Sequence, residues 1–127
     1  MNFLNHFTFL VLLASTFVAQ AIFATTVDKN TWISEYKKAV SSGWCSDPTI
    51  AECWPVSEKT CKAEVKTAVE SCTKQFESQL PAKLVQPKDG TLWGSKIGSC
   101  TGEQYAAALK KSFNKNSKRC LEMDKRK

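Results

Sequence analysis

The sequence contains 127 residues, of which 43% are hydrophobic and 24% are charged, and its formal net charge is +6. This length fits one domain of ordinary size and excludes a multidomain enzyme. The hydrophobic fraction is too high for a disordered chain, so we expect a small, basic, globular protein with a packed core.

The N-terminal end has the features of a secretory signal peptide. A short apolar run spans residues 7–17 and is followed by the small-residue pattern Ala19-Gln20-Ala21, which signal peptidase accepts. The run is shorter than the ~20 apolar residues of a membrane span. We therefore expect cleavage after residue 21 and one exported domain over residues 22–127, located in the periplasm or outside the cell and not spanning the membrane.

All six cysteines lie in the part that we expect to be exported, and they predict three disulfide bonds. A zinc site is the competing interpretation, but the sequence has no close Cys-x(2–4)-Cys pair, and its one histidine, His6, lies in the predicted signal peptide. We therefore expect disulfides, no metal and no other cofactor. The six cysteines are Cys45, Cys53, Cys61, Cys72, Cys100 and Cys120.

The lack of histidine in residues 22–127 also restricts catalysis. Imidazole is the side chain best suited to exchange protons near neutral pH, so Ser-His-Asp and Cys-His mechanisms are excluded. A hydrolase with two carboxylates stays open as an alternative, but most of the twelve acidic residues are spread singly beside lysines, as on a solvated helix face. We therefore expect a protein without enzymatic activity.

The first predicted helix covers residues 28–42, where hydrophobic side chains recur at helical spacing and Gly43 follows as a C-cap. Residues 44–55 are expected to form a loop with aromatic flanks. Within this loop, the pair Asp47-Pro48 allows a single helical turn.

The strongest helical pattern follows the loop and ends at Pro81. Ser57 is its expected N-cap, and an apolar stripe runs from Cys61 to Leu80 on one face. The opposite face alternates Lys and Glu four residues apart, which is typical of a solvated surface.

Residues 82–89 are expected to form a connector, after which glycines recur every four residues. The nucleotide-binding pattern G-x-G-x-x-G is absent, so we interpret the segment as a short helix whose glycines allow close packing, with an irregular loop as the alternative. The four glycines are Gly90, Gly94, Gly98 and Gly102.

The last predicted helix begins at a capping box, with Thr101 as the N-cap and Gln104 at the third helical position, and it continues to Cys120. No β-like alternation of useful length is present. The sequence therefore predicts an all-α fold, a small disulfide-stapled bundle of three to four helices that follows a cleaved signal peptide.

Helix geometry ranks the possible cysteine pairings. If the long helix and the last helix pack antiparallel, Cys61 meets Cys120 and Cys72 meets Cys100, which leaves Cys45 to pair with Cys53. Under this arrangement, the Cys61→Ala substitution removes a long-range disulfide and is expected to cause most of the loss of stability that full reduction would cause.

The positive charge is concentrated at the C-terminal end. Residues 110–127 contain eight Lys or Arg against two acidic residues, which accounts for the whole formal excess. A functional interpretation is docking on lipopolysaccharide, anionic lipid or an acidic protein, and nucleic acid is disfavoured because no recognised fold signature accompanies the charge. The alternative is a solvated face with a basic tail. The candidate binding residues are Lys111, Lys115, Lys118 and Arg119.

A second candidate surface surrounds the first two cysteines. Trp44 and Trp54 flank the ring that a Cys45–Cys53 disulfide would close, and Ile50 lies at its tip. Rigid aromatic side chains are good binding anchors. The favoured alternative is that both tryptophans cover the core of a small domain.

These observations predict a secreted or periplasmic protein that binds another macromolecule, as an inhibitor, immunity protein, effector or envelope accessory protein. A carrier of a small hydrophobic ligand is the second possibility, with a cavity that four aromatic residues would line. A carboxylate-based hydrolase is the third. The aromatic residues considered for the cavity are Phe76, Trp93, Tyr105 and Phe113.

Overall fold

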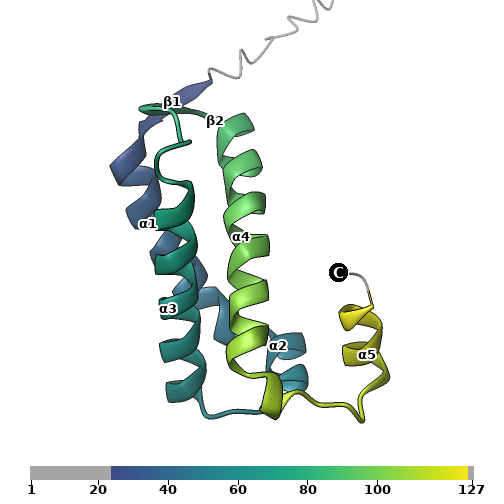
Figure 1. Ribbon diagram of the computed structural model, residues 1–127. Helices are drawn as coiled ribbons and strands as arrows, with labels where there is room; N and C mark the ends of the chain where they lie inside the picture. Colours follow the sequence, from purple (N-terminus) through teal and green to yellow (C-terminus); the bar gives the residue numbers. More distant parts are fainter. Residues whose placement is uncertain (1–23, 126–127) are drawn as a thin grey trace, which may run out of the picture.

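The computed structural model describes residues 24–125, so the predicted signal peptide, residues 1–21, lies outside the described residues. The described part is mostly helical (Figure 1). Its elements in chain order are β1 (Thr25–Asp28), α1 (Lys29–Gly43), η1 (Trp44–Ser46), α2 (Pro48–Cys53), α3 (Glu58–Phe76), β2 (Lys83–Gln86), α4 (Lys88–Ala108), η2 (Lys110–Ser112) and α5 (Lys118–Asp124).

The three long helices α1, α3 and α4 form an elongated body, and α3 lies beside α4 with opposite chain direction (Figure 1). The short helices α2 and α5 lie at the other end of the body from the strands. We call residues 114–125, which contain α5, the arm. The predicted disulfide-bonded helical bundle is confirmed.

The body ends in a small sheet that the sequence analysis did not predict. Strands β1 and β2 pair antiparallel, with Thr25 opposite Gln86 and Asp28 opposite Lys83. Leu84 is fully buried beneath the sheet. The segment expected to be a plain connector therefore fixes the start of α1 against the start of α4.

Two of the three capping predictions for the first half of the chain are confirmed. The Ser57 hydroxyl accepts a hydrogen bond from the Thr60 N–H at 3.1 Å, which confirms Ser57 as the N-cap of α3. Asp47 caps α2 through its carboxylate, so the single helical turn is confirmed. The prediction that Gly43 is a C-cap is wrong, because Gly43 has right-handed helical angles and the chain continues directly into η1.

Helix α4 is continuous over the point where two separate helices were expected. Thr101 is not an N-cap: it is buried in the middle of α4, and its hydroxyl donates to the Ile97 carbonyl at 2.7 Å. The packing interpretation of the glycines is confirmed, because added Cβ atoms at Gly94 and Gly98 would lie 3.5 and 3.3 Å from Tyr36. The glycine-containing face of α4 thus leaves room for the ring of Tyr36 on α1.

The chain leaves the helical path after α4, so the prediction of one helix running to Cys120 is wrong. The Asn114 backbone N–H donates to the Cys53 carbonyl at 2.8 Å, and its side-chain amide donates to the Glu52 carbonyl at 3.2 Å. Asn114 also accepts from the Asn116 N–H at 3.0 Å. These bonds replace helical ones and turn the chain into the arm.

One of the three predicted disulfides is confirmed, the Cys72–Cys100 bond between α3 and α4. The other two are Cys45–Cys61 and Cys53–Cys120, so the predicted Cys61–Cys120 and Cys45–Cys53 pairs are wrong. The physical reason is the break after α4, which brings Cys120 to the end of α2 instead of the start of α3. Cys61 therefore closes a span of only 16 residues, whereas Cys53–Cys120 spans 67.

Two hydrophobic clusters fill the interior. The first, which we call the β-end cluster, lies beneath the strands and consists of Cys72, Leu80, Leu84, Trp93 and Ile97. The second, the arm-end cluster, lies between α2, α3, α4 and the arm. Its buried members are Cys53, Trp54, Cys61, Val65, Ala68, Tyr105, Leu109 and Cys120.

Candidate binding groove

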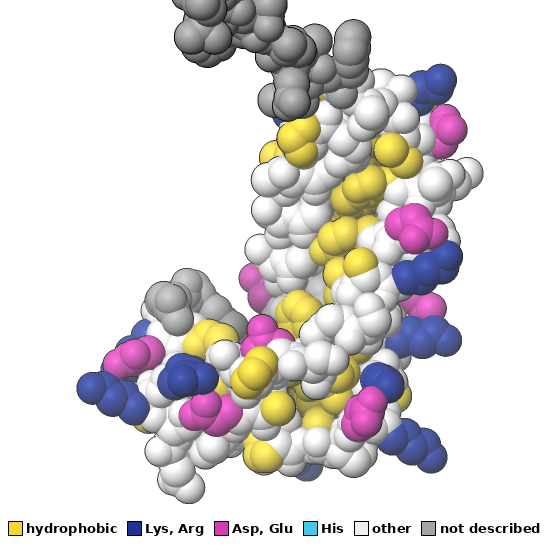
Figure 2. Space-filling model, turned by 180° about the vertical axis from the view of Figure 1, so that it is seen from behind, with side chains coloured by type: hydrophobic (Ala, Val, Ile, Leu, Met, Phe, Trp, Pro, Cys, Tyr) yellow, Lys and Arg dark blue, Asp and Glu magenta, His cyan; other side chains and the backbone are white. Residues whose placement is uncertain are grey.

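A groove lies between α4 and the arm. It consists of two adjoining hollows of about 450 and 340 Å³ that share four lining residues, Trp54, Glu103, Phe113 and Asp124. Seen from behind, hydrophobic side chains gather where the arm meets the body (Figure 2). We call the larger hollow the outer hollow and the smaller one the inner hollow.

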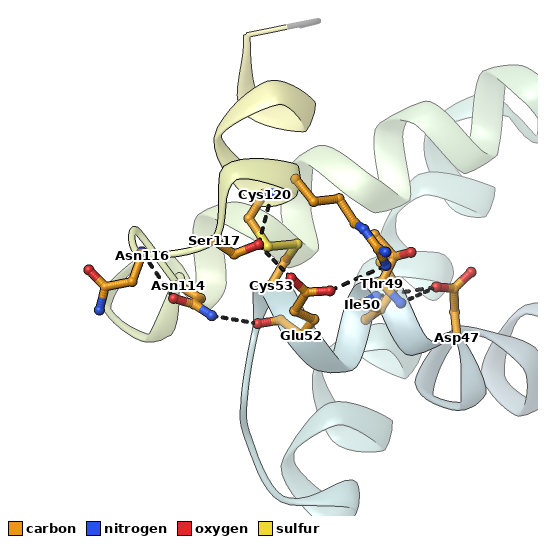
Figure 3. Close-up of a disulfide and its surroundings, with 10 residues drawn as sticks. Asp47, Thr49, Ile50, Glu52, Cys53, Asn114, Asn116, Ser117 and Cys120 are labelled. Atoms are coloured by element: carbon orange, nitrogen blue, oxygen red, sulfur yellow. Dashed lines mark hydrogen bonds and ion pairs between the residues drawn. A yellow bond between two sulfur atoms is a disulfide. The ribbon is translucent and has the colours of Figure 1, made fainter.

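The arm is held in place by α2, as Figure 3 shows. The Cys53–Cys120 disulfide joins the end of α2 to α5. The Glu52 carboxylate makes two further contacts with the arm, one with the Ser117 hydroxyl and one with the Arg119 guanidinium at 3.2 Å. The second wall of the groove is therefore held by a covalent bond, by these carboxylate contacts and by the hydrogen bonds of Asn114 to α2.

Aromatic rings form the floor of the groove. Trp54 is only 7% exposed, and its ring lies 5.4 Å from Phe113 at a tilt of 54°. The edge of Tyr105 packs between Trp54 and Trp44, at 5.6 Å from each ring centroid. Burial raises the pKa of the Tyr105 hydroxyl above its usual value, and the nearby Glu64 adds to this effect. The floor is therefore rigid and largely apolar.

Two polar atoms in this floor lack a protein partner. The indole N–H groups of Trp44 and Trp54 are buried, and neither has a hydrogen-bond acceptor in the described part of the chain. Buried donors are usually satisfied. Both residues line the inner hollow, but the two nitrogen atoms themselves are buried beneath its surface.

The rim of the groove carries charges of both signs. Glu103 and Asp124 line both hollows, whereas Lys110 and Lys115 line only the outer one. The inner hollow thus has an acidic rim, and the outer hollow has mixed charges.

The structure brings the predicted aromatic surface together in one place. Trp44, Ile50 and Trp54 all line the inner hollow. Ile50 is half-buried against the arm-end cluster and does not protrude from a disulfide ring. The interpretation of Trp54 as a core residue holds as well, because its ring serves the core and the groove floor at once.

The predicted basic residues do not share one helix face, because the expected helix is broken. Lys111 lies in η2, Lys115 in the connecting loop and Lys118 at the start of α5, and all three are exposed. Of these, only Lys115 lines the groove. Arg119 is engaged with Glu52.

Sequence reasoning missed the contribution of the arm to the groove. Leu121 and Met123 face it from α5, and Glu103 faces it from α4. The apolar residues Leu121 and Met123, which follow Cys120 within a highly charged segment, were the available signal. The four aromatic residues proposed for a carrier cavity do not meet, because Phe76 and Trp93 belong to the β-end cluster.

Two further properties concern the described residues only. Between residues 24 and 125, no helix is long and apolar enough to cross a membrane. Over the same range, no three His, Cys, Asp or Glu side chains are grouped so as to hold a metal ion.

Comparison with known proteins gives one match. Residues 26–113 match the family described as the T2SS substrate NttA, which covers more than two thirds of the chain, and α5 lies beyond the matched residues. Searches of the curated proteins and of the solved structures return no match. The oxidising periplasm that substrates of this system cross suits the three disulfides. The chain belongs to the NttA family of type II secretion system substrates, and is thus a disulfide-bonded protein secreted by way of the periplasm.

Proposed function

We propose that this secreted protein is a non-enzymatic binding protein that holds part of another macromolecule in the groove between α4 and the arm. The observation that carries the proposal is the groove itself, because it is open, floored by Trp54 and Phe113 and flanked by the exposed Leu121. Rigid aromatic floors with a polar rim are typical of interaction surfaces.

Several features support a binding role over a catalytic one. Among the described residues that line the groove there is no imidazole, and there is no free thiol because all six cysteines form disulfides. The lowered pKa of Glu58 results from its hydrogen bond and ion pair with Lys62 on the surface of α3, a pattern of helix stabilisation. A carboxyl group that transfers protons near neutral pH would instead need a raised pKa.

The same features favour a surface-binding protein over a carrier of small hydrophobic ligands. A carrier encloses its cargo, and this groove lies open along the arm. The interior is occupied instead by two packed clusters. Gentle purification should therefore release no stoichiometric lipid.

The experiment compares two exposed leucines. A photo-crosslinking amino acid replaces Leu121, which is 40% exposed in the groove, or Leu92, which is 47% exposed on α4 and lies outside both hollows. We expect position 121 to give a discrete adduct with cells or envelope fractions that meet the secreted protein, and position 92 to give none. Equal labelling from both positions would show that the groove is not the binding site.

A second candidate function rests on the exposed lysines beside the groove. Lys111, Lys115 and Lys118 are exposed, and none of them forms an ion pair among the described residues. They provide a positive surface for an anionic partner such as lipopolysaccharide, anionic lipid or an acidic protein. Reversing these three charges should weaken binding strongly at low salt. Unchanged binding would rule out the electrostatic contribution.

A further inference from the structure

We infer that the groove recognises a phosphocholine group, with the trimethylammonium in the inner hollow and the phosphate at the lysines of the outer hollow. This inference rests on the proposed function, because it assumes that the groove is the binding site. It goes further by naming the chemistry of the ligand.

The lining of the inner hollow suits an organic cation. Its lining includes the aromatic residues Trp44, Trp54 and Phe113, and Glu103 contributes a carboxylate. Among residues 24–125, neither Lys nor Arg lines it. Aromatic faces together with negative charge form the environment that holds quaternary ammonium groups, because the ring quadrupole attracts a cation that cannot donate hydrogen bonds.

The remaining walls of the inner hollow favour methyl groups over a bare ammonium. Ile50 and Met123 are apolar, and both are partly buried against the arm-end cluster. A primary ammonium needs acceptors for three N–H groups, whereas the methyls of a trimethylammonium pack against aliphatic and thioether side chains. The volume of about 340 Å³ leaves room for such a group.

The outer hollow, which shares Glu103 and Asp124 with the inner one, adds two positive charges directly beside this site. Lys110 and Lys115 line it, and Trp54 and Phe113 are common to both hollows. Lysine ammonium groups form charge-assisted hydrogen bonds with phosphate oxygens.

Juxtaposed charges of both signs select for a zwitterion. A lone anion at Lys110 and Lys115 is repelled by Glu103, which lines both hollows. A lone organic cation leaves those two lysines without compensation. A ligand in which a cation is followed closely by an anionic group, as in phosphocholine, meets both requirements.

The experiment titrates the oxidised mature protein with four small probes at constant ionic strength. The probes are phosphocholine, choline, phosphoethanolamine and inorganic phosphate, and binding is followed by backbone amide shifts of groove residues. We expect saturable shifts around Glu103 and Phe113 with phosphocholine, and about tenfold weaker binding of the other three probes. Equal binding of phosphoethanolamine or of inorganic phosphate would overturn the inference, as would the absence of any shift with phosphocholine.

Two charge variants with a matched control locate the site. Glu103→Gln should weaken phosphocholine and choline alike, whereas Lys115→Gln should weaken phosphocholine and leave choline unchanged. Glu70→Gln, an exposed carboxylate on α3 that lines neither hollow, is the control and should change nothing. If the control weakens binding as much as Glu103→Gln does, the ligand is not in the groove and the inference fails.

The source of the phosphocholine and the proposed function are tested separately. Co-sedimentation with phosphatidylcholine vesicles identifies a lipid head group, and binding of the soluble probe without co-sedimentation identifies a free or non-lipid phosphocholine; either result supports the inference. If position 121 crosslinks to a partner while phosphocholine gives no shifts, the binding function stands and the phosphocholine inference falls. If phosphocholine binds in the groove while position 121 captures nothing, the phosphocholine site stands and the proposal of a macromolecular partner held by the groove falls.

Discussion

The two ends of the molecule are built differently. At the β end, the strands, α1, α3 and α4 pack around the β-end cluster, and the Cys72–Cys100 bond joins two helices that already lie side by side. At the arm end, α5 has only seven residues and packs against α2, which has six. A helix of this length is not stable alone in water, so the arm depends on its tether.

This difference separates the stable scaffold from the part with a candidate function. Backbone pairing, long helices and buried side chains hold the β end. A disulfide, the carboxylate of Glu52 and the hydrogen bonds of Asn114 to α2 hold the arm, which forms one wall of the groove. Functional surfaces are commonly formed by such less stable segments placed on a rigid frame.

The largest expected effects come from two separate variants, each of which lacks the disulfide at one end of the molecule. The double variant Cys53→Ser/Cys120→Ser should release the arm while leaving the body folded. The chain-entropy estimate for its span of 67 residues is about 4 kcal/mol. Hydrogen exchange should show lost amide protection in residues 117–125 and retained protection in α3.

The matched control is Cys72→Ser/Cys100→Ser, whose span of 28 residues corresponds to about 3.5 kcal/mol. Because this bond lies inside the body, its loss should lower the protection of α3 and α4 together. The contrast between the two ends is wrong if both double variants give the same exchange pattern.

A smaller effect is expected at the polar tether of the arm. Glu52→Gln removes the ion pair with Arg119, whose side chain is 60% exposed, so the change should cost about 0–1 kcal/mol. Arm amides should exchange faster at low salt, and added salt should reduce the difference from the wild type. A loss of protection in β1 and β2 instead would contradict the local role given to Glu52.

The smallest effect concerns alkaline pH, and the two tyrosines of the sequence report on the two ends separately. Tyr36 packs against the β-end cluster and Tyr105 lies in the arm-end cluster, and burial raises the pKa of both hydroxyls. The unfolded chain therefore ionises first, so stability is complete below pH ~10 and falls as the pH rises through the folded-state values.

Absorbance titration checks this prediction, since it follows tyrosine ionisation directly. Each Tyr→Phe variant leaves one reporter and should show an apparent pKa above that of a free tyrosine. Tyr36→Phe also removes the hydrogen bond to the Gly94 carbonyl at 2.9 Å, so it should lower stability at neutral pH as well. A free-tyrosine value for either residue would show that its end of the molecule is open to solvent.

Local sequence signals were sufficient for α1, α2 and α3, but they divided α4 into two helices at Thr101. Ser57 and Asp47 cap their helices through short-range hydrogen bonds, which depend only on neighbouring residues. The glycines of α4 were interpreted correctly as packing positions. Their partners, Tyr36 and Trp44, lie far away in the sequence, so spacing alone did not identify them.

Features set by distant parts of the chain were not predictable in this way. Strand β1 has four residues and pairs with β2 more than 50 positions later, so neither shows a useful alternation. The break after α4 depends on Asn114 bonding to α2. Two disulfides were assigned wrongly because that break redirects Cys120 from the start of α3 to the end of α2.

The candidate site was therefore only half predictable. Trp44, Ile50 and Trp54 were chosen for their aromatic and apolar character, and they line the inner hollow. The opposite wall, with Leu121 and Met123, depends on the path of the arm. The lysines were chosen as one helical row, and they lie instead on separate short segments.

The arm held against α2 is the central claim, and the most direct test is peptide mapping of the secreted protein by mass spectrometry without reduction. The account predicts a linked pair of peptides that contain Cys53 and Cys120, together with Cys45–Cys61 and Cys72–Cys100. A peptide pair that joins Cys61 to Cys120, or a free thiol at either position, would place the arm elsewhere and remove the groove.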